Sequence, residues 1–184
     1  MPPNKPERKP KAEVTRYLGL DLSLSPGAAC IAVKNRIPTL IAADSVATSN
    51  ADNDAIRSHT VESFIAQFIY THRPALPLRF AAVIREDFTS GRNKRATQTI
   101  FSAWAASDRA LHAYGYGIDA EISPTSVKKI VTGNGRAEKP EVADHVRRIL
   151  RLGADHTFKS GYDDSDALGV CLAYLIREEL IDVC

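Results

Sequence analysis

Hydrophobic and polar residues alternate along several short segments of the chain. In residues 17–24 a leucine stands at every second position, and Asp21 lies among the residues between the leucines. Successive side chains of a β-strand point to opposite faces, so the pattern predicts a strand with its leucines on one face and Asp21 on the other. Four more segments are predicted to be strands, and they span residues 28–33, 39–44, 79–85 and 117–122.

Between and after these strands, apolar residues recur at spacings of three and four, which is the pattern of helices. The predicted helices span residues 52–71, 94–114, 123–130, 139–152 and 163–180. Short links favour an antiparallel meander for the first three strands, and the later strands alternate with helices. The resulting order, βββαβαβα, predicts an α/β fold in which helices cover both faces of a five-stranded mixed sheet.

The composition fits a single globular domain. A length of 184 residues suits one domain with a sizeable core, and 44% hydrophobic and 25% charged residues are ordinary values. No apolar stretch approaches the roughly 20 residues of a membrane span, and the polar start has no signal-peptide core. Three widely spaced cysteines, Cys30, Cys171 and Cys184, support neither a disulfide framework nor a cysteine-ligated zinc site. We therefore expect a cytoplasmic protein without membrane contact.

Charge is unevenly distributed, although the net charge is only +2. Residues 1–16 are rich in proline, lysine and arginine, and we expect a disordered basic tail ahead of one folded domain at 17–184. A basic stretch at 128–151 is followed by an acidic one at 153–184. A phosphate-binding surface beside a metal site would show this arrangement, and solvated helix faces would show it as well.

Four carboxylates occupy positions where chemistry is expected. Asp21 lies in the first strand, Glu86 ends the fourth, and Asp163 and Asp166 open the last helix, where a spacing of three places them on one face. Brought together by the fold, these acids would repel one another unless a cation bound between them. Mg²⁺ is a hard cation that prefers oxygen ligands and leaves positions open for phosphate and water. The pattern therefore predicts a metal-dependent phosphoryl-transfer site.

Each acid also has a simpler interpretation. Asp163 and its neighbours could cap a helix and complement its dipole, and Glu86 could be a surface acid at a strand end. Asp21 is harder to explain in this way, because an acid inside a leucine-rich strand is costly unless its charge is compensated. Asp164 is a rival to Asp163 as a metal ligand, but on a helix the two side chains point about 100° apart.

Three stretches of the sequence resemble the RuvC family of Holliday junction resolvases, within the ribonuclease H-like nuclease superfamily. The most specific is ISPTSVKKIVTGNGRAEKPEVADHVRRIL at residues 122–150, and GLDLS and DSDALG agree with it. The likeness is thin across residues 35–78. The basic tail, and a helix TIFSAWAASDRAL that lacks the family's Gly-x-Ala-x-Gly, suggest a divergent branch such as one encoded by a phage or mobile element.

The resemblance implies a catalytic tetrad of Asp21, Glu86, Asp163 and Asp166 that holds two Mg²⁺ ions per active site, with Mn²⁺ as a substitute. Hydrolysis through two metals would leave 5′-phosphate and 3′-hydroxyl ends. A homodimer would cut opposite strands of a four-way junction symmetrically, in DNA recombination and repair. A branch-migration motor is a conceivable partner that the sequence does not reveal.

The resemblance also implies DNA contacts. Lys128 and Lys139 match family lysines near the scissile phosphate, where a cation stabilises developing negative charge. Gly133 and Gly135 would permit close approach of the backbone to phosphate. The full set of expected DNA-binding residues is Phe88, Arg92, Asn93, Lys94, Arg95, Lys129, Gly133, Asn134, Gly135, Arg136, Arg147 and Arg148.

Several alternatives stay open at this point. Phe88 either wedges between base pairs at the junction centre or is buried in the core, and Trp104 and Phe101 belong either to a dimer interface or to the core. The same active site could act more broadly on flaps and forks. GLDLSLSPGA also resembles a phosphate loop of actin-like kinases, but the chain is short for two such lobes and has no second Asp-Gly-Gly motif. A non-catalytic DNA-binding scaffold would not need all four acids.

Overall fold

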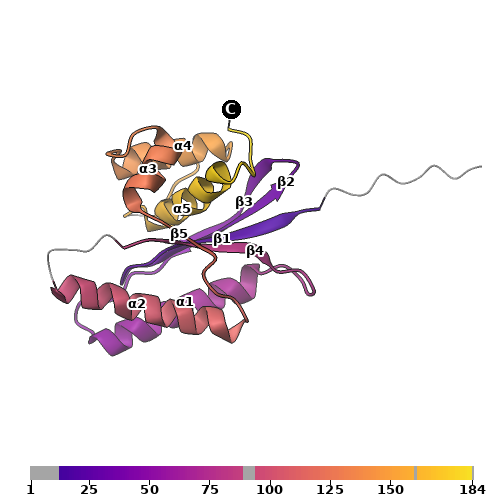
Figure 1. Ribbon diagram of the computed structural model, residues 1–184. Coiled ribbons are helices and arrows are strands. Elements are labelled where there is room, and N and C mark those ends of the chain that lie inside the picture. Colours follow the sequence, from indigo (N-terminus) through magenta and orange to yellow (C-terminus); the bar gives the residue numbers. More distant parts are fainter. Residues whose placement is uncertain (1–12, 89–93, 160, 184) are drawn as a thin grey trace, which may run out of the picture.

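The computed structural model describes residues 13–88, 94–159 and 161–183. Ten elements follow one another in this part of the chain (Figure 1), namely β1 (Thr15–Asp21), β2 (Gly27–Lys34), β3 (Ile37–Ser45), α1 (Asp54–His72), β4 (Phe80–Glu86), α2 (Lys94–Ala113), β5 (Ala120–Ile122), α3 (Pro124–Thr132), α4 (Lys139–Ile149) and α5 (Asp163–Arg177). Within the described residues, no helix is both long and apolar enough to cross a membrane.

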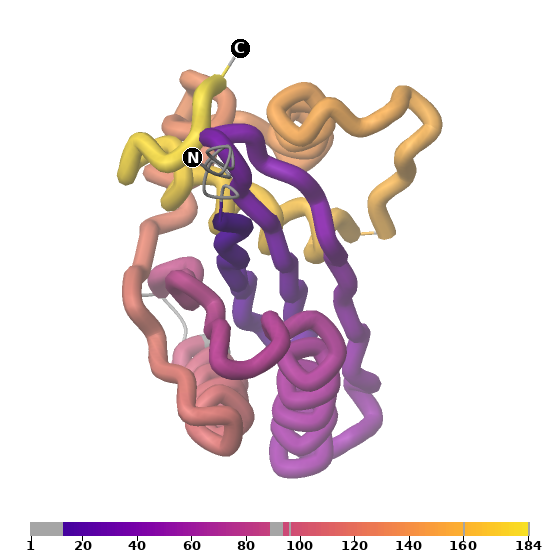
Figure 2. The backbone as a smooth tube through the Cα atoms, turned by 90° about the vertical axis from the view of Figure 1, so that its right-hand side faces the viewer, coloured from indigo at the N-terminus to yellow at the C-terminus, as the bar shows by residue number. Residues whose placement is uncertain are grey.

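The five strands form one mixed sheet in the order β3-β2-β1-β4-β5. The first three strands pair antiparallel and run side by side (Figure 2), whereas β4 and β5 lie parallel to β1 and to each other. Leu20 of β1 is in register with Arg85 of β4, so the next residues along, Asp21 and Glu86, end neighbouring parallel strands at the same edge of the sheet. The predicted five-stranded mixed sheet is confirmed, and its topology brings two of the four acids together.

Helices cover both faces of the sheet, as predicted. Figure 1 shows α1 and α2 on one face and α3, α4 and α5 on the other. Leu18 and Leu20 are fully buried against the α1 and α2 side, while Tyr17 packs into the core that contains α5. The alternation in the first strand therefore separates two hydrophobic cores, and it directs Asp21 toward the α5 side.

Two glycines let α5 approach the sheet closely. A Cβ atom on Gly19 would lie 2.5 Å from the carbonyl oxygen of Ala167, and one on Gly27 would lie 1.9 Å from the carbonyl oxygen of Asp163. Any larger residue at either position would push the start of α5 away from the ends of β1 and β2. The absence of a side chain at Gly19 and Gly27 thus determines how closely Asp163 approaches the sheet.

The element boundaries differ from the predicted ones at a few places. β1 begins at Thr15 rather than Tyr17, because Thr15 pairs with Val33 of β2, and most of the predicted tail, residues 1–12, lies outside the described residues. β5 is limited to three residues because Asp119 interrupts the ladder. The Asp119 carboxylate accepts a hydrogen bond from the amide of Val83 at 2.8 Å, in place of a backbone carbonyl.

Candidate active site

Three of the four predicted acids meet at one point of the structure. Asp21, from the end of β1, and Asp163 and Asp166, from the first turn of α5, each offer an oxygen, and these oxygens all lie within 4.8 Å of one another. Glu86, from the end of β4, lines the same cleft, which has a volume of about 280 Å³. The cleft also contains Lys128 and Lys139. All six residues that we expected to take part in catalysis therefore line a single cleft.

The structure separates Asp164 from this group. Its side chain is buried, one carboxylate oxygen accepts a hydrogen bond from the amide of Lys159 at 3.1 Å, and the other accepts one from the amide of Ser165 at 2.9 Å. Asp164 therefore holds the loop that leads into α5. The N-cap of α5 is Tyr162, and no side chain caps the helix, so capping does not explain Asp163.

Burial and mutual repulsion raise the pKa values of two of the carboxylates, Asp21 and Glu86. Burial, together with the charges of Asp166 and Asp163, raises the pKa of Asp21 from 3.8 to about 7, although Lys139 acts in the opposite direction. Burial and the charges of Asp21 and Asp166 raise the pKa of Glu86 from 4.5 to about 8. A divalent cation would relieve this repulsion, and a set of carboxylate oxygens suits hard cations such as Mg²⁺ or Mn²⁺. The donor set therefore fits the metal that the sequence predicted.

Lys139 lies within the acid cluster. Its Nζ donates to Oδ2 of Asp166 at 2.8 Å, to Oδ1 of Asp163 at 3.3 Å, and to the carbonyl oxygen of Gly161 at 2.8 Å. Burial lowers the pKa of Lys139, but the hydrogen bonds and charges of the two aspartates outweigh it, so the pKa of Lys139 is raised. A protonated ammonium group is thus fixed at the place where phosphate would approach the acids.

The positions of the two lysines follow from helix packing. α3 and α4 both pack against α5, and Val127 of α3 and Val142 of α4 each come within 3.5 Å of the place where a Cβ on Gly169 would stand. Because α4 begins at Lys139, this packing places the lysine over the first turn of α5. Lys128 lies next to Val127, and its charge offsets part of the rise in the pKa of Glu86.

Ser23 is a residue of the cleft that we did not predict. It lines the cleft beside Asp21 and Glu86, and its hydroxyl accepts a hydrogen bond from the amide of Ser25 at 2.9 Å. The signal was present in the sequence, since a period of two places Ser23 on the same face as Asp21.

Phe88 is half-buried beside the acid cleft. Its ring packs edge-on against Phe101 of α2 at a centroid distance of 6.1 Å, so the structure places it against the protein. Of the other predicted DNA contacts near it, Arg92 and Asn93 lie outside the described residues. Lys94 and Arg95 are exposed at the start of α2, and Arg95 forms an ion pair with Asp54 at 2.9 Å.

The loop between α3 and α4 connects the helices that carry Lys128 and Lys139. Gly133 has a φ of +82° and ends α3 with its amide bonded to the carbonyl oxygen of Lys129, so it is a helix cap in the left-handed conformation. The Oδ1 of Asn134 accepts a hydrogen bond from the amide of Arg136, which shapes the turn. Gly135 packs against Thr125, where a Cβ would meet Cγ2 at 3.1 Å. Lys129 and Arg136 are exposed, and neither lines the acid cleft.

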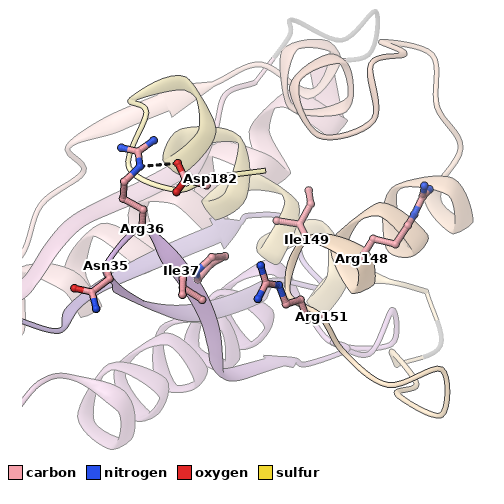
Figure 3. Close-up of a pocket in the computed structure, with 8 residues that line it drawn as sticks. Asn35, Arg36, Ile37, Arg148, Ile149, Arg151 and Asp182 are labelled. Atoms are coloured by element: carbon pink, nitrogen blue, oxygen red, sulfur yellow. Dashed lines mark hydrogen bonds and ion pairs between the residues drawn. The ribbon is translucent and has the colours of Figure 1, made fainter. Parts of the chain in front are cut away.

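Arg147 and Arg148 lie at the far end of α4, about 13 Å from Lys139 along the helix axis. Arg147 donates to Asp144 and to the carbonyl oxygen of His156, so it holds the loop that follows α4. Arg148 borders a pocket of about 260 Å³ together with Arg36 and Arg151. In Figure 3, Arg36 is paired with Asp182, and the guanidinium group of Arg148 points away from both. These two arginines are therefore remote from the acid cleft.

The fold is that of the ribonuclease H-like class, and its converging acids are compatible with a divalent metal ion. The sequence model of the family described as "Crossover junction endodeoxyribonuclease RuvC" matches residues 18–174. The chain therefore belongs to the RuvC family, and it is an endonuclease that resolves Holliday junctions in DNA recombination and repair.

Individual relatives agree with this assignment. Crossover junction endodeoxyribonuclease RuvC of Polynucleobacter necessarius is 32% identical over 158 residues, which cover 85% of this chain and 86% of that one. The protein of the same name from Streptomyces coelicolor is 33% identical over 165 residues, covering 88% and 82%. The structure of T. thermophilus RuvC in complex with a Holliday junction substrate superposes with a TM-score of 0.75 at 25% identity, and the match covers 90% of this chain and 96% of that one.

Proposed function

We propose that Asp21, Glu86, Asp163 and Asp166 are the catalytic tetrad and together hold two Mg²⁺ ions, for which Mn²⁺ can substitute. The observation that carries this proposal is the convergence of carboxylate oxygens from β1 and α5 within 4.8 Å, in a cleft that also contains Glu86. When bound, the ions supply an activated water and stabilise the leaving 3′ oxygen of the phosphodiester. The products would carry 5′-phosphate and 3′-hydroxyl ends, which a ligase can seal.

The chain's own residues then have defined roles in this proposal. Asp21, at the end of β1, would hold the metal together with Asp163 and Asp166 of α5. Lys139 is held between Asp163 and Asp166, so it would also reach a phosphate bound at these acids and stabilise its negative charge. Lys128 approaches the same phosphate from α3 and stabilises the negative charge that develops on it.

The substrate in this proposal is a four-way DNA junction, and the active form is a homodimer. The structure of the T. thermophilus relative is a complex with a Holliday junction substrate, and the superposition with this chain covers 96% of that protein. A two-fold axis through the dimer would place two acid clefts on opposite strands and produce paired, symmetric nicks. The exposed ring of Phe101 on α2 is a candidate for the dimer interface, because 53% of its surface is accessible in the single chain.

A substrate panel tests this function. End-labelled immobile four-way junctions, flaps, forks and linear duplexes are incubated with the protein in Mg²⁺, in Mn²⁺ or in EDTA. Paired symmetric nicks in the four-way junction alone, abolished by EDTA, are the expected result. Equal or faster cutting of flaps and forks would contradict a preference for four-way junctions. It would indicate a broader branched-DNA endonuclease that uses the same acids.

A further inference from the structure

An exposed ion pair attaches the loop before α5 to the edge of the sheet. The Nζ of Lys159 pairs with a carboxylate oxygen of Asp44 in β3, and it also donates to the carbonyl oxygen of Ser45 at 2.8 Å. β3 is the outermost strand beside β2. Because Lys159 and Asp44 are 115 residues apart in the chain, only the folded structure brings them together.

The backbone of Lys159 is at the same time bonded to the start of α5. Its amide donates to the buried carboxylate of Asp164 at 3.1 Å, and its carbonyl oxygen accepts a hydrogen bond from the amide of Tyr162 at 3.0 Å. Tyr162 is the N-cap of α5, and its own carbonyl oxygen accepts a hydrogen bond from the amide of Asp166 at 2.8 Å. One residue thus contacts the sheet through its side chain and the first turn of α5 through its backbone.

The turn before α5 depends on contacts from outside the helix. Tyr162 has a φ of +65°, in the left-handed region that residues other than glycine rarely adopt, and no side chain caps the helix. Such a conformation persists only where the surrounding structure holds it. On the sheet, Gly27 of β2 lies so close to the carbonyl group of Asp163 that no Cβ would fit, and Gly27 is in register with Ser45. Lys159 is therefore anchored at the same level of the sheet as the start of α5.

We propose that Lys159 is a positioning residue for the metal site, and that its ion pair with Asp44 holds the first turn of α5 against the sheet. In this position Asp163 and Asp166 lie close to Asp21. The inference rests on the function proposed above, in which these acids hold the metal. Both side chains of the pair are about half exposed, and exposed ion pairs contribute little to stability. Loss of the pair should therefore affect metal binding while the Tm in EDTA changes little.

Two single substitutions test this role, because they change the local charge in opposite directions. Lys159→Gln removes a positive charge and Asp44→Asn removes a negative one, but both break the ion pair. We expect both variants to bind Mn²⁺ about 10-fold more weakly in calorimetry without DNA, as when groups that orient metal ligands are replaced. A purely electrostatic effect would strengthen Mn²⁺ binding in Lys159→Gln and weaken it in Asp44→Asn. That result, or native affinity in both variants, would overturn the proposal.

A double substitution and a control variant complete the calorimetry. Asp44→Lys combined with Lys159→Asp exchanges the charges and keeps the combined length of the two side chains, so most of the native Mn²⁺ affinity should return. Glu178→Gln breaks a comparably exposed ion pair with Arg177 at the other end of α5, and it should leave Mn²⁺ binding unchanged. No recovery in the double variant, or an equal loss in the control, would contradict the positioning role.

A direct contact with DNA is the rival role for Lys159, because its side chain is exposed. Junction binding in EDTA separates the two roles. We expect Lys159→Gln to bind the four-way junction as tightly as the native protein, but to need about 10-fold more Mg²⁺ for half-maximal cleavage. Weaker junction binding with unchanged Mn²⁺ affinity would overturn the proposal. If the native protein neither binds Mn²⁺ nor needs a divalent ion to cut, the proposed function itself has failed and the inference fails with it.

Discussion

The Nζ of Lys139 lies 2.8 Å from Oδ2 of Asp166. The same ammonium group lies 3.3 Å from Oδ1 of Asp163 and bonds to the carbonyl oxygen of Gly161, so one lysine neutralises much of the acid cluster. A cation is thus built into the protein at the place where a divalent ion would act. The lysine and the metal ions must therefore compete for the same oxygens, and this competition has measurable consequences.

Replacing Lys139 with glutamine should strengthen metal binding and weaken cleavage. Without the ammonium group the carboxylates attract a divalent ion more strongly, so calorimetry should show tighter Mn²⁺ binding. The scissile phosphate loses a cation, so junction cleavage should fall by about 100-fold. Lys129→Gln is the matched control, because Lys129 is an exposed lysine on α3 that does not line the cleft. Equal effects of the two substitutions would show that only the general positive charge of this surface matters.

The stability of the metal-free protein should fall as the pH rises. The folded-state pKa values of Asp21 and Glu86, about 7 and about 8, lie above their ordinary values of 3.8 and 4.5, so the folded protein holds more protons than the unfolded chain between these limits. The stabilising contribution of the protonated acids is complete below about pH 4 and is lost as the pH passes through 7 to 8. Thermal unfolding in EDTA should therefore show a lower Tm at pH 8.5 than at pH 6.

Two controls accompany the pH measurement. Saturating Mg²⁺ should raise the Tm most at high pH, where the acids are ionised. The Asp21→Asn variant should show a flatter dependence of Tm on pH. A Tm in EDTA that rises from pH 6 to pH 8.5 would contradict the electrostatic description of the cleft.

Gly19 is predicted to be essential for the position of α5. In Gly19→Ala the new methyl group would meet the carbonyl oxygen of Ala167 at 2.5 Å, so either α5 moves or the strand distorts. We expect a loss of about 1–3 kcal/mol in the free energy of unfolding, and a larger loss of cleavage, because Asp163 and Asp166 move with the helix. Gly117→Ala is the control, since no heavy atom lies within 4 Å of the added Cβ. Urea unfolding and junction cleavage measure both effects, and equal behaviour of the two variants would refute the role of Gly19.

Phe101 should matter for the proposed homodimer. Phe101→Asp places a charge on the exposed part of α2, so light scattering should show a monomer, and paired nicks in the junction should give way to rare single nicks. Ile56→Asp is a matched control, because Ile56 is a comparably exposed apolar residue on α1. If the Phe101→Asp protein remains dimeric, the dimer interface does not include Phe101.

The strands, the helices and the candidate acids could be predicted because their signals lie within short segments of the sequence. The alternation around Asp21 and the spacing of Asp163 and Asp166 are periodic signals, and they depend only on the geometry of a strand and a helix. The same geometry separated Asp163 from Asp164, which the structure shows bonded to the backbone of Lys159 and Ser165.

Other features depend on contacts between distant segments, and these were not predictable. The need for glycine at Gly19 arises only when α5 packs against β1. The network of Arg85 with Trp104, Asp108 and Glu121 joins three elements that no spacing relates. Gly133 was expected to approach phosphate, and the structure shows a different role for it as a helix cap, which becomes visible only with its φ angle of +82°.

The most direct test of the central claim compares two neighbouring aspartates. Asp163→Asn removes a carboxylate from the cluster, whereas Asp164→Asn removes one charge at the next residue and keeps an oxygen for one of its two backbone hydrogen bonds, that from Lys159 or that from Ser165. Cleavage of a four-way junction in Mg²⁺ is measured for both at equal protein stability. The account predicts that Asp163→Asn cuts more than about 100-fold more slowly than the native protein, while Asp164→Asn retains most of the activity. Full activity in Asp163→Asn, or an equal loss in both, would contradict the assignment of the acid cluster as the catalytic metal site.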